Sequence, residues 1–198
     1  MKIYLVRHGQ TLFNLHERVQ GWCDSPLTQE GIVQAKALSK SLQSIPFEYA
    51  YSSTSERAMD TMHYILQDRN VPYAYVKGLK ELNFGCLEGE KKADVFTDIR
   101  VYEKGFEMYG GETLISSNQR FMSCLETIAK KHTDPVLVVA HGGVIMGALR
   151  CLDEARFMEH MEKVGFVDNC SVTLLEYTDH FEILDLADTS YRDRGLLL

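Results

Sequence analysis

Two segments of the sequence carry residue types that could perform phosphate chemistry. Arg7-His-Gly9 follows the apolar run 2–6, and His141-Gly-Gly143 follows the apolar run 136–140. An imidazole can attack phosphorus while it is neutral, and an arginine guanidinium matches the oxygens of a phosphate group. Glycine lets backbone N–H groups approach an anion closely. A tripeptide of this kind is common by chance, so its meaning depends on the rest of the chain.

The chain contains several further short motifs. The first motif is Arg7-His-Gly-Gln-Thr11, followed by Asn14, Gly21-Trp22, Asp24-Ser-Pro-Leu-Thr28 and Gly31. The second is Ser52-Ser53 with Arg57, Ala58 and Thr61, and the third is Glu81 with Phe84-Gly85 and Glu88-Gly89. The last two are Gly111-Glu112 and His141-Gly-Gly-Val144. In this order, over roughly residues 2 to 150, the motifs resemble those of the histidine phosphatase superfamily, the phosphoglycerate mutase-like proteins.

The resemblance implies a role for each matching position. His8 would be the nucleophile that takes the phosphoryl group as phosphohistidine, and Glu81 would protonate the leaving oxygen and later activate water. The implied catalytic set is His8, Glu81, His141, Arg7 and Arg57, and the implied substrate-binding set is Arg7, Gly9, Asn14, Arg57 and Gly142. In both sets the arginines and His141 hold the phosphate, Asn14 adds a hydrogen-bond donor, and the glycines serve the backbone geometry.

Charge arguments favour the same assignment. Arg7 and Arg57 are expected to lower the pKa of His8, which keeps the attacking nitrogen unprotonated. Glu81 must instead carry a proton near neutral pH, and the negative charge of a substrate would raise its pKa. Fixed donors aimed at the transferring phosphoryl group supply most of the stabilisation in such reactions. Because the arginines and His141 neutralise the phosphate, we expect no metal ion and no cofactor.

Some positions have a second interpretation. Arg57 is alternatively a solvated helix residue, and His141 is alternatively a hydrogen-bonded core histidine. Glu81 lies in a charged segment, so it is alternatively a surface residue, and Glu88 is then the proton donor.

The motifs predict a phosphatase that hydrolyses a small phosphorylated metabolite. Mutases of the family usually show a basic or aromatic run after the acid, whereas Leu82-Asn-Phe84 stands here, and 198 residues leave no room for their longer middle insertion. Two alternatives stay open, a cofactor-dependent phosphoglycerate mutase and a non-catalytic sensor of phosphorylated ligands. The physiological substrate cannot be read from the sequence, although residues 79–111 and 154–166 are expected to shape its pocket.

Strands and helices alternate along most of the chain. Apolar β-prone runs predict strands at 2–6, 49–52, 71–77 and 136–140. Apolar residues at helical spacing predict helices at 28–44, 55–66, 113–132, 144–151 and 154–163. A β-hairpin is predicted from the two runs 170–177 and 181–186. This order predicts one domain over residues 1–198, an α/β three-layer sandwich. Its central sheet is mostly parallel with helices on both faces and a C-terminal β-hairpin, and residues 79–111 form an excursion over the active-site end.

The predicted sheet is what would bring the two histidines together. The run 136–140 is the most apolar strand, so it is expected at the centre of the sheet. In sheets of this class, ligands bind beyond the carboxyl ends of the strands. His8 and His141 are 133 positions apart, and they meet there if their strands are neighbours.

Composition excludes several other classes of protein. A net charge of −7, with 21 Lys and Arg scattered among 28 Asp and Glu, disfavours a nucleic-acid partner. Five dispersed cysteines without a CxxC pair disfavour disulfides and a zinc site and indicate free thiols. No apolar run reaches membrane-spanning length. We therefore expect a cytoplasmic protein without a membrane partner, and a homodimer stays open as its oligomeric state.

Overall fold

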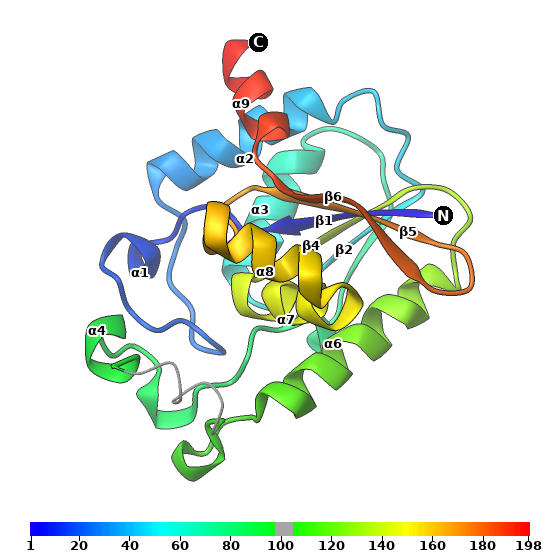
Figure 1. The fold of residues 1–198 in the computed structure, drawn as a ribbon. Coiled ribbons are helices and arrows are strands. Elements are labelled where there is room, and N and C mark those ends of the chain that lie inside the picture. The colour runs from blue at the N-terminus through cyan, green and yellow to red at the C-terminus, as the bar shows by residue number, and fades with distance from the viewer. Residues whose placement is uncertain (98–104) are drawn as a thin grey trace.

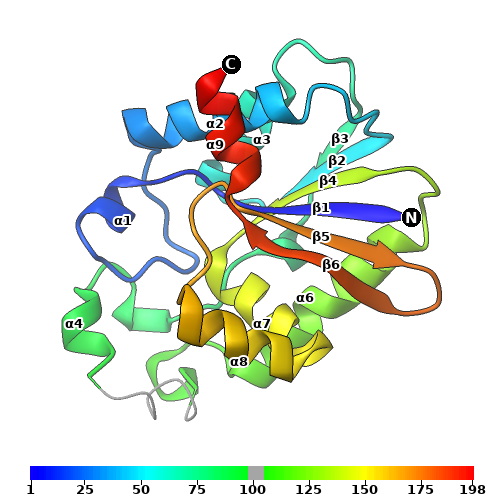
Figure 2. The ribbon, with the colours of Figure 1, turned by 45° about the horizontal axis from the view of Figure 1, so that its top comes forward.

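The computed structural model describes residues 1–97 and 105–198, and a six-stranded sheet forms its centre (Figures 1 and 2). The strand order is β3 (Tyr73–Tyr75), β2 (Tyr49–Ser52), β4 (Val136–Ala140), β1 (Lys2–Arg7), β5 (Val172–Tyr177) and β6 (Phe181–Asp188). The first four strands are parallel to one another, and β5 runs antiparallel to both β1 and β6. The mostly parallel sheet and the C-terminal hairpin are thus confirmed.

Helices cover both faces of the sheet, as the sequence predicts. On one face lie α2 (Gln29–Ser41) and α3 (Glu56–Leu66), and on the other lie α6 (Leu114–Ala129) and α7 (Gly142–Leu152). The alternation of β4 explains this arrangement, because successive side chains of a strand point to opposite faces. Leu137 and Val139 pack with α2 and α3, while Val136 and Val138 pack with α6 and α7.

Helix ends differ from the predictions by a few residues. Thr28 caps α2 by accepting a hydrogen bond from the Gly31 amide at 3.0 Å, and Thr113 caps α6 in the same way. Helix α7 begins at Gly142, two residues before the predicted start. The prediction placed the start after the two glycines because glycine has a low helix propensity. Strand β3 is also shorter than the predicted run 71–77.

The C-terminal helix was not predicted. Helix α9 (Ser190–Leu197) follows β6 and turns back onto α2 (Figure 1). The two helices touch closely at Gly195, where a Cβ atom would lie 1.8 Å from the carbonyl oxygen of Ala37. Its side-chain pattern is polar rather than amphipathic, so no helical periodicity predicts it. Helix α8 (Glu154–Lys163) was predicted and lies beside α7.

The described part of the predicted excursion contains little regular structure. It holds the 3₁₀ turns Lys77–Leu79, Gly85–Leu87 and Glu107–Tyr109 and the short helix α4 (Lys92–Val95). Its own small core includes Val19, Leu82, Phe84, Val95 and Phe106. The short helix α1 (Leu12–Leu15) lies nearby, at the same end of the sheet (Figure 2). Residues 98–104 of the excursion lie outside the described part of the chain.

None of the helices in the described ranges is long and apolar enough to cross a lipid bilayer.

Candidate active site

The two histidines meet at the carboxyl ends of neighbouring strands. In the parallel pairing of β1 with β4, Arg7 lies opposite Ala140, and the His8 amide donates to the Ala140 carbonyl at 3.0 Å. The imidazole centroids of His8 and His141 are 5.3 Å apart. Both side chains are almost completely buried. The register of the sheet therefore makes one site from two distant sequence motifs.

The His8 ring has a defined tautomer. Its Nδ1 lies 2.8 Å from the carbonyl oxygen of Gly9, which can only accept, so Nδ1 carries the proton and donates it there. The lone pair is therefore on Nε2. Burial lowers the pKa of His8 well below its usual 6.5, and the positive charges of Arg57 and Arg7 lower it further. The ring is thus neutral near pH 7, as a nucleophile requires.

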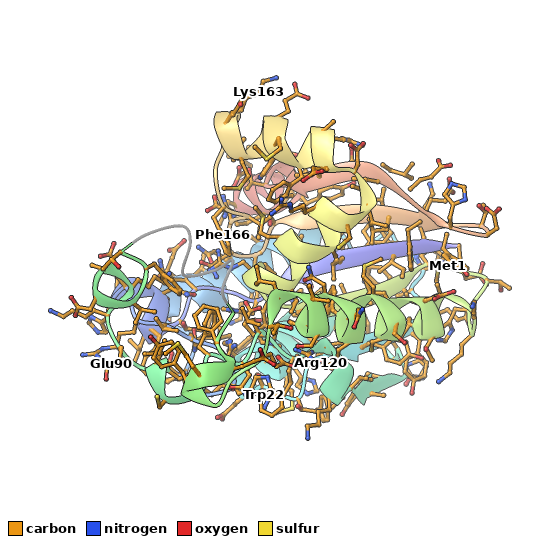
Figure 3. All side chains as sticks on the ribbon, turned by 60° about the horizontal axis from the view of Figure 1, so that its bottom comes forward. Met1, Trp22, Glu90, Arg120, Lys163 and Phe166 are labelled. Carbon is orange, nitrogen blue, oxygen red and sulfur yellow. The ribbon has the colours of Figure 1, made fainter. Side chains whose placement is uncertain are left out.

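Residues of the loop after α8 hold the Arg7 side chain. Its Nη1 donates to the Val167 carbonyl at 2.5 Å, and its guanidinium carbon lies 5.4 Å from the centre of the Phe166 ring. Figure 3 shows Phe166 on the chain that leaves Lys163 at the end of α8. Burial lowers the pKa of Arg7 to about 10, which still leaves it charged at neutral pH.

Arg57 is completely buried, which excludes a solvated helix residue. Its Nη1 donates to the Cys23 carbonyl at 3.0 Å and to the Asp24 carboxylate at 2.9 Å, and its Nη2 donates to the Gly21 carbonyl at 2.8 Å. Nε and the second hydrogen of Nη2 are left for a further acceptor within the described ranges. The charge acts on the site all the same, since it lowers the pKa of both His8 and His141.

Several buried nitrogen atoms around the histidines have no hydrogen-bond partner within the described ranges. They are Nε of Arg7, Nε of Arg57 and both ring nitrogens of His141. A buried polar atom without a partner costs about 1–3 kcal/mol. His141 is therefore not a hydrogen-bonded core histidine. A bound anion would accept hydrogen bonds from the two Nε atoms and from the one ring nitrogen of His141 that carries a proton.

Glu81 reaches the site from the excursion and is buried rather than exposed. Its Oε2 accepts from the Gly143 amide at 2.7 Å, and its Oε1 accepts from the amides of Val144 and Leu82, each at 2.9 Å. Burial raises the pKa of Glu81, although these amides and the Arg57 charge oppose the shift. The direction of the shift suits a group that must carry a proton.

The backbone of Glu81 is anchored as well. Its carbonyl oxygen accepts from Trp22 Nε1 at 2.9 Å and from Arg120 Nη2 at 3.1 Å, and both side chains lie near one another in Figure 3. Arg120 is in turn paired with Glu112 at 2.9 Å, the glutamate of the Gly111-Glu112 motif. This network fixes where the Glu81 carboxyl group enters the site.

Glu88 has a different place. Its Oε1 accepts from the amides of Trp22 at 2.8 Å and Phe84 at 3.1 Å, and its Oε2 accepts from the Cys23 amide. It does not line the cavity. Glu88 therefore holds the loop 21–24, whose carbonyl oxygens bind Arg57, and it is remote from the reacting groups.

The glycines of the two histidine motifs make room for neighbours. A Cβ on Gly142 would lie 2.3 Å from the Phe166 ring, and a Cβ on Gly143 would lie 2.7 Å from the Glu81 carboxylate. Gly9 was expected to serve the backbone geometry of the site, and its own amide donates to the Thr61 hydroxyl at 3.0 Å. Gly9 serves the site through the carbonyl that holds His8.

Asn169 is a site residue that the sequence reasoning missed. Its Nδ2 donates to the His8 carbonyl at 2.8 Å and to Oδ1 of Asn14 at 3.2 Å. Asn14 also accepts from the Thr11 amide through Oδ1, and within the described ranges its own Nδ2 has no hydrogen-bond acceptor. No local sequence signal points to Asn169, because its place follows from the antiparallel pairing of β5 with β1, which puts the start of β5 at the end of β1 that carries His8.

A cavity of about 360 Å³ opens from this site. Of the predicted site residues, Arg7, His8, Asn14, Glu81 and Gly142 line it. Arg57 and His141 are completely buried and are not among the residues that line it. The segments 79–111 and 154–166 both contribute wall residues, as expected from the sequence.

Known proteins resemble this chain in sequence and in fold. A 2,3-bisphosphoglycerate-dependent phosphoglycerate mutase 2 of Gloeobacter violaceus is 34% identical over 191 residues, covering 88% of this chain and 85% of that protein. A metal-independent phosphoserine phosphatase of Arabidopsis thaliana is 33% identical over 195 residues, covering 93% and 79%. A solved phosphoglycerate mutase structure from Bacillus anthracis matches with a TM-score of 0.88 at 30% identity, covering 98% of this chain and 96% of that one. The family model of the histidine phosphatase superfamily (branch 1) matches residues 3–189, and the chain belongs to this superfamily.

Proposed function

We propose that this protein is a metal-independent phosphatase that hydrolyses phosphomonoesters of small metabolites through a phosphohistidine at His8. The observation that carries the proposal is the pairing of a neutral His8, whose lone pair is on Nε2, with buried unpaired nitrogens of Arg7, Arg57 and His141. A nucleophile and a set of donors for phosphate oxygens thus lie side by side. The phosphoserine phosphatase among the relatives supports the same reading.

The first step transfers the phosphoryl group to the enzyme. Nε2 of His8 attacks phosphorus, and the bond from phosphorus to the ester oxygen breaks. Negative charge on the equatorial oxygens is stabilised by Arg7, His141 and the Nε of Arg57. The proton of Glu81 passes to the departing oxygen, so an alcohol leaves and Glu81 becomes a carboxylate.

The second step returns the enzyme to its starting state. The Glu81 carboxylate takes a proton from a water molecule, whose oxygen attacks phosphorus as the bond to Nε2 breaks. Inorganic phosphate leaves, His8 is neutral again and Glu81 is protonated again. The amides of Gly143 and Val144 favour the carboxylate form of Glu81 between the two steps.

The proposal of metal independence rests on how the phosphate charge would be neutralised. Arg7 and Arg57 are close enough to act electrostatically on His8, and they would offset the phosphate charge that a metal ion would otherwise offset. Within the described ranges, His, Cys, Asp and Glu side chains do not gather in threes as a metal site would require. EDTA should therefore leave the rate unchanged, and a large loss that added metal restores would contradict this part of the proposal.

A mutase is the second candidate, because one of the relatives is a phosphoglycerate mutase. The discriminating assay follows phosphate release from 4-nitrophenyl phosphate in the absence of bisphosphoglycerate. Steady turnover supports the phosphatase, whereas turnover that needs bisphosphoglycerate supports the mutase. A base quench during turnover should trap an acid-labile phosphoenzyme. Absence of this species together with absence of turnover would point to a sensor of phosphorylated ligands.

A further inference from the structure

Beyond the phosphate end, the cavity wall is mainly apolar. It includes Leu82, Phe84, Leu114, Met146, Phe157 and Met161, which come from the excursion, from the start of α6 and from α7 and α8. The volume of about 360 Å³ is within the usual range of small-molecule sites, roughly 300–1,000 Å³, and far exceeds what a phosphate group fills. The wall therefore accommodates a sizeable leaving group.

The charged side chains of the wall are almost all cationic. Arg18 and Lys92 line the cavity, and neither has an ion pair within the described ranges. Arg18 donates to the Gly89 carbonyl at 2.6 Å, which leaves its charge unneutralised. Arg150, also on the wall, is paired with Glu154. These cations disfavour a positively charged leaving group.

Acidic groups are correspondingly scarce. Among the described residues that line the cavity, the one carboxyl group is that of Glu81, and three backbone amides occupy it. Glu17 is close enough to act on Lys92 but does not line the cavity. An ammonium group in the leaving group would thus lose its hydration and find no counter-ion, which is costly.

We propose that the physiological substrate is a phosphomonoester whose leaving alcohol carries a bulky apolar or aromatic body and no amino group. This inference rests on the proposed function and deepens it. The apolar body would pack against the wall formed by Phe84, Leu114 and Met161, and Ser117 and Asn118 would supply a few polar contacts. Small amino-alcohol phosphates are then poor substrates.

Three esters of closely related primary alcohols test this selectivity. They are 2-phenylethyl phosphate, ethyl phosphate and O-phosphoethanolamine, which differ only in phenyl, hydrogen or ammonium on the second carbon. Because an extra methylene in an apolar pocket is worth about tenfold or more, the phenyl ester should exceed the ethyl ester about 100-fold in kcat/KM. The ammonium ester should fall below the ethyl ester. Equal values for all three, or a preference for the ammonium ester, would overturn the inference.

A matched pair of variants tests the wall itself. Met161 and Met158 are both partly exposed on α8, but only Met161 lines the cavity. Met161→Gln should lower kcat/KM for 2-phenylethyl phosphate about tenfold relative to kcat/KM for ethyl phosphate. Met158→Gln should alter neither. Equal effects of the two substitutions on the phenyl ester would show that the apolar body binds elsewhere.

Failure of this inference is distinguishable from failure of the proposed function. If none of the three esters nor 4-nitrophenyl phosphate is hydrolysed and no phosphoenzyme forms, the proposed function is wrong. If all are hydrolysed at similar rates through a trapped phosphoenzyme, the function stands and the substrate class is wrong.

Discussion

The two ends of the cavity are built in different ways. At the phosphate end, His8 and His141 follow paired strands, and ladder hydrogen bonds of the sheet set their separation. At the other end, the wall side chains come from helices and from the excursion rather than from strands, and some of them, such as Met161, are partly exposed. The comparison indicates that the sheet fixes the chemistry, whereas the outer wall sets selectivity and can change without disturbing the sheet.

The largest expected effect is at the phosphate end. His8→Ala removes the attacking nitrogen, so kcat should fall by roughly 10⁴-fold or more for every ester, on the scale seen when a catalytic nucleophile is removed. The phosphoenzyme trapped by a base quench should disappear. His63→Ala is the matched control, because His63 is exposed on α3 and bonds Tyr75 at 2.8 Å. Residual activity of His8→Ala above a tenth of the wild-type rate would refute the assignment.

Glu81→Gln should have the next largest effect, and its size should depend on the leaving group. For an alkyl phosphate the departing oxygen needs a proton, so kcat should fall by roughly 10²–10⁴-fold. For 4-nitrophenyl phosphate, whose phenolate is stable without a proton, the first step should be nearly unaffected. Burst kinetics of 4-nitrophenol release separate the two steps. Similar losses of the first step for both esters would exclude Glu81 as the proton donor.

The pH dependence supplies a second check on Glu81. Activity requires a neutral His8, whose lowered pKa places the acidic limb of kcat/KM below pH 6.5. Activity also requires a protonated Glu81, so the rate should fall as the pH rises through its pKa, which burial raises above 4.5. The ionisation of the substrate itself also contributes to the fall of the rate at high pH. For an alkyl phosphate, Glu81→Gln should therefore remove the rest of this basic limb and leave only the contribution of the substrate. A profile unchanged by the substitution would assign that limb to another group.

The sequence predicted the part of the molecule that the sheet organises. Apolar periodicity identified the strands of the phosphate end, and the parallel pairing of β1 with β4 then brought His8 to His141. Motif resemblance supplied Arg57 and Glu81, which come from segments that periodicity alone does not connect. The strand predictions are confirmed because strands depend on local patterns, whereas the catalytic roles of Arg57 and Glu81 stay predictions.

Other features depend on contacts that no local pattern records. Helix α9 is polar, and its place on α2 depends on the close approach at Gly195. Which of the two carboxylates, Glu81 or Glu88, enters the site depends on the backbone amides that each one binds after folding. The position of Asn169 beside the His8 carbonyl depends on the antiparallel pairing of β5 with β1. Each of these required tertiary structure.

Asn169→Asp tests how strictly the phosphate end is positioned. The substitution keeps the shape but removes the donor that joins the His8 carbonyl to Asn14. Because small displacements of catalytic groups are costly, kcat should fall about 10- to 100-fold, equally for 2-phenylethyl and ethyl phosphate. In a double-mutant cycle with Asn14→Asp the losses should be less than additive. Fully additive losses would indicate that the two residues act independently.

Glu88→Gln should have the smallest effect on catalysis and an effect on stability instead. Glu88 accepts three backbone amides, including those of Trp22 and Cys23, and a glutamine would turn its NH₂ group toward one of these donors. The free energy of unfolding should fall by about 1–3 kcal/mol, as for a buried donor that loses its partner. Denaturant unfolding and kcat/KM measured on the same samples check this.

Because Glu88 acts only through the loop that holds Arg57, kcat/KM should change by less than about tenfold, and the basic limb of the pH profile should persist. A loss of that limb in Glu88→Gln, with Glu81→Gln retaining it, would exchange the roles of the two carboxylates.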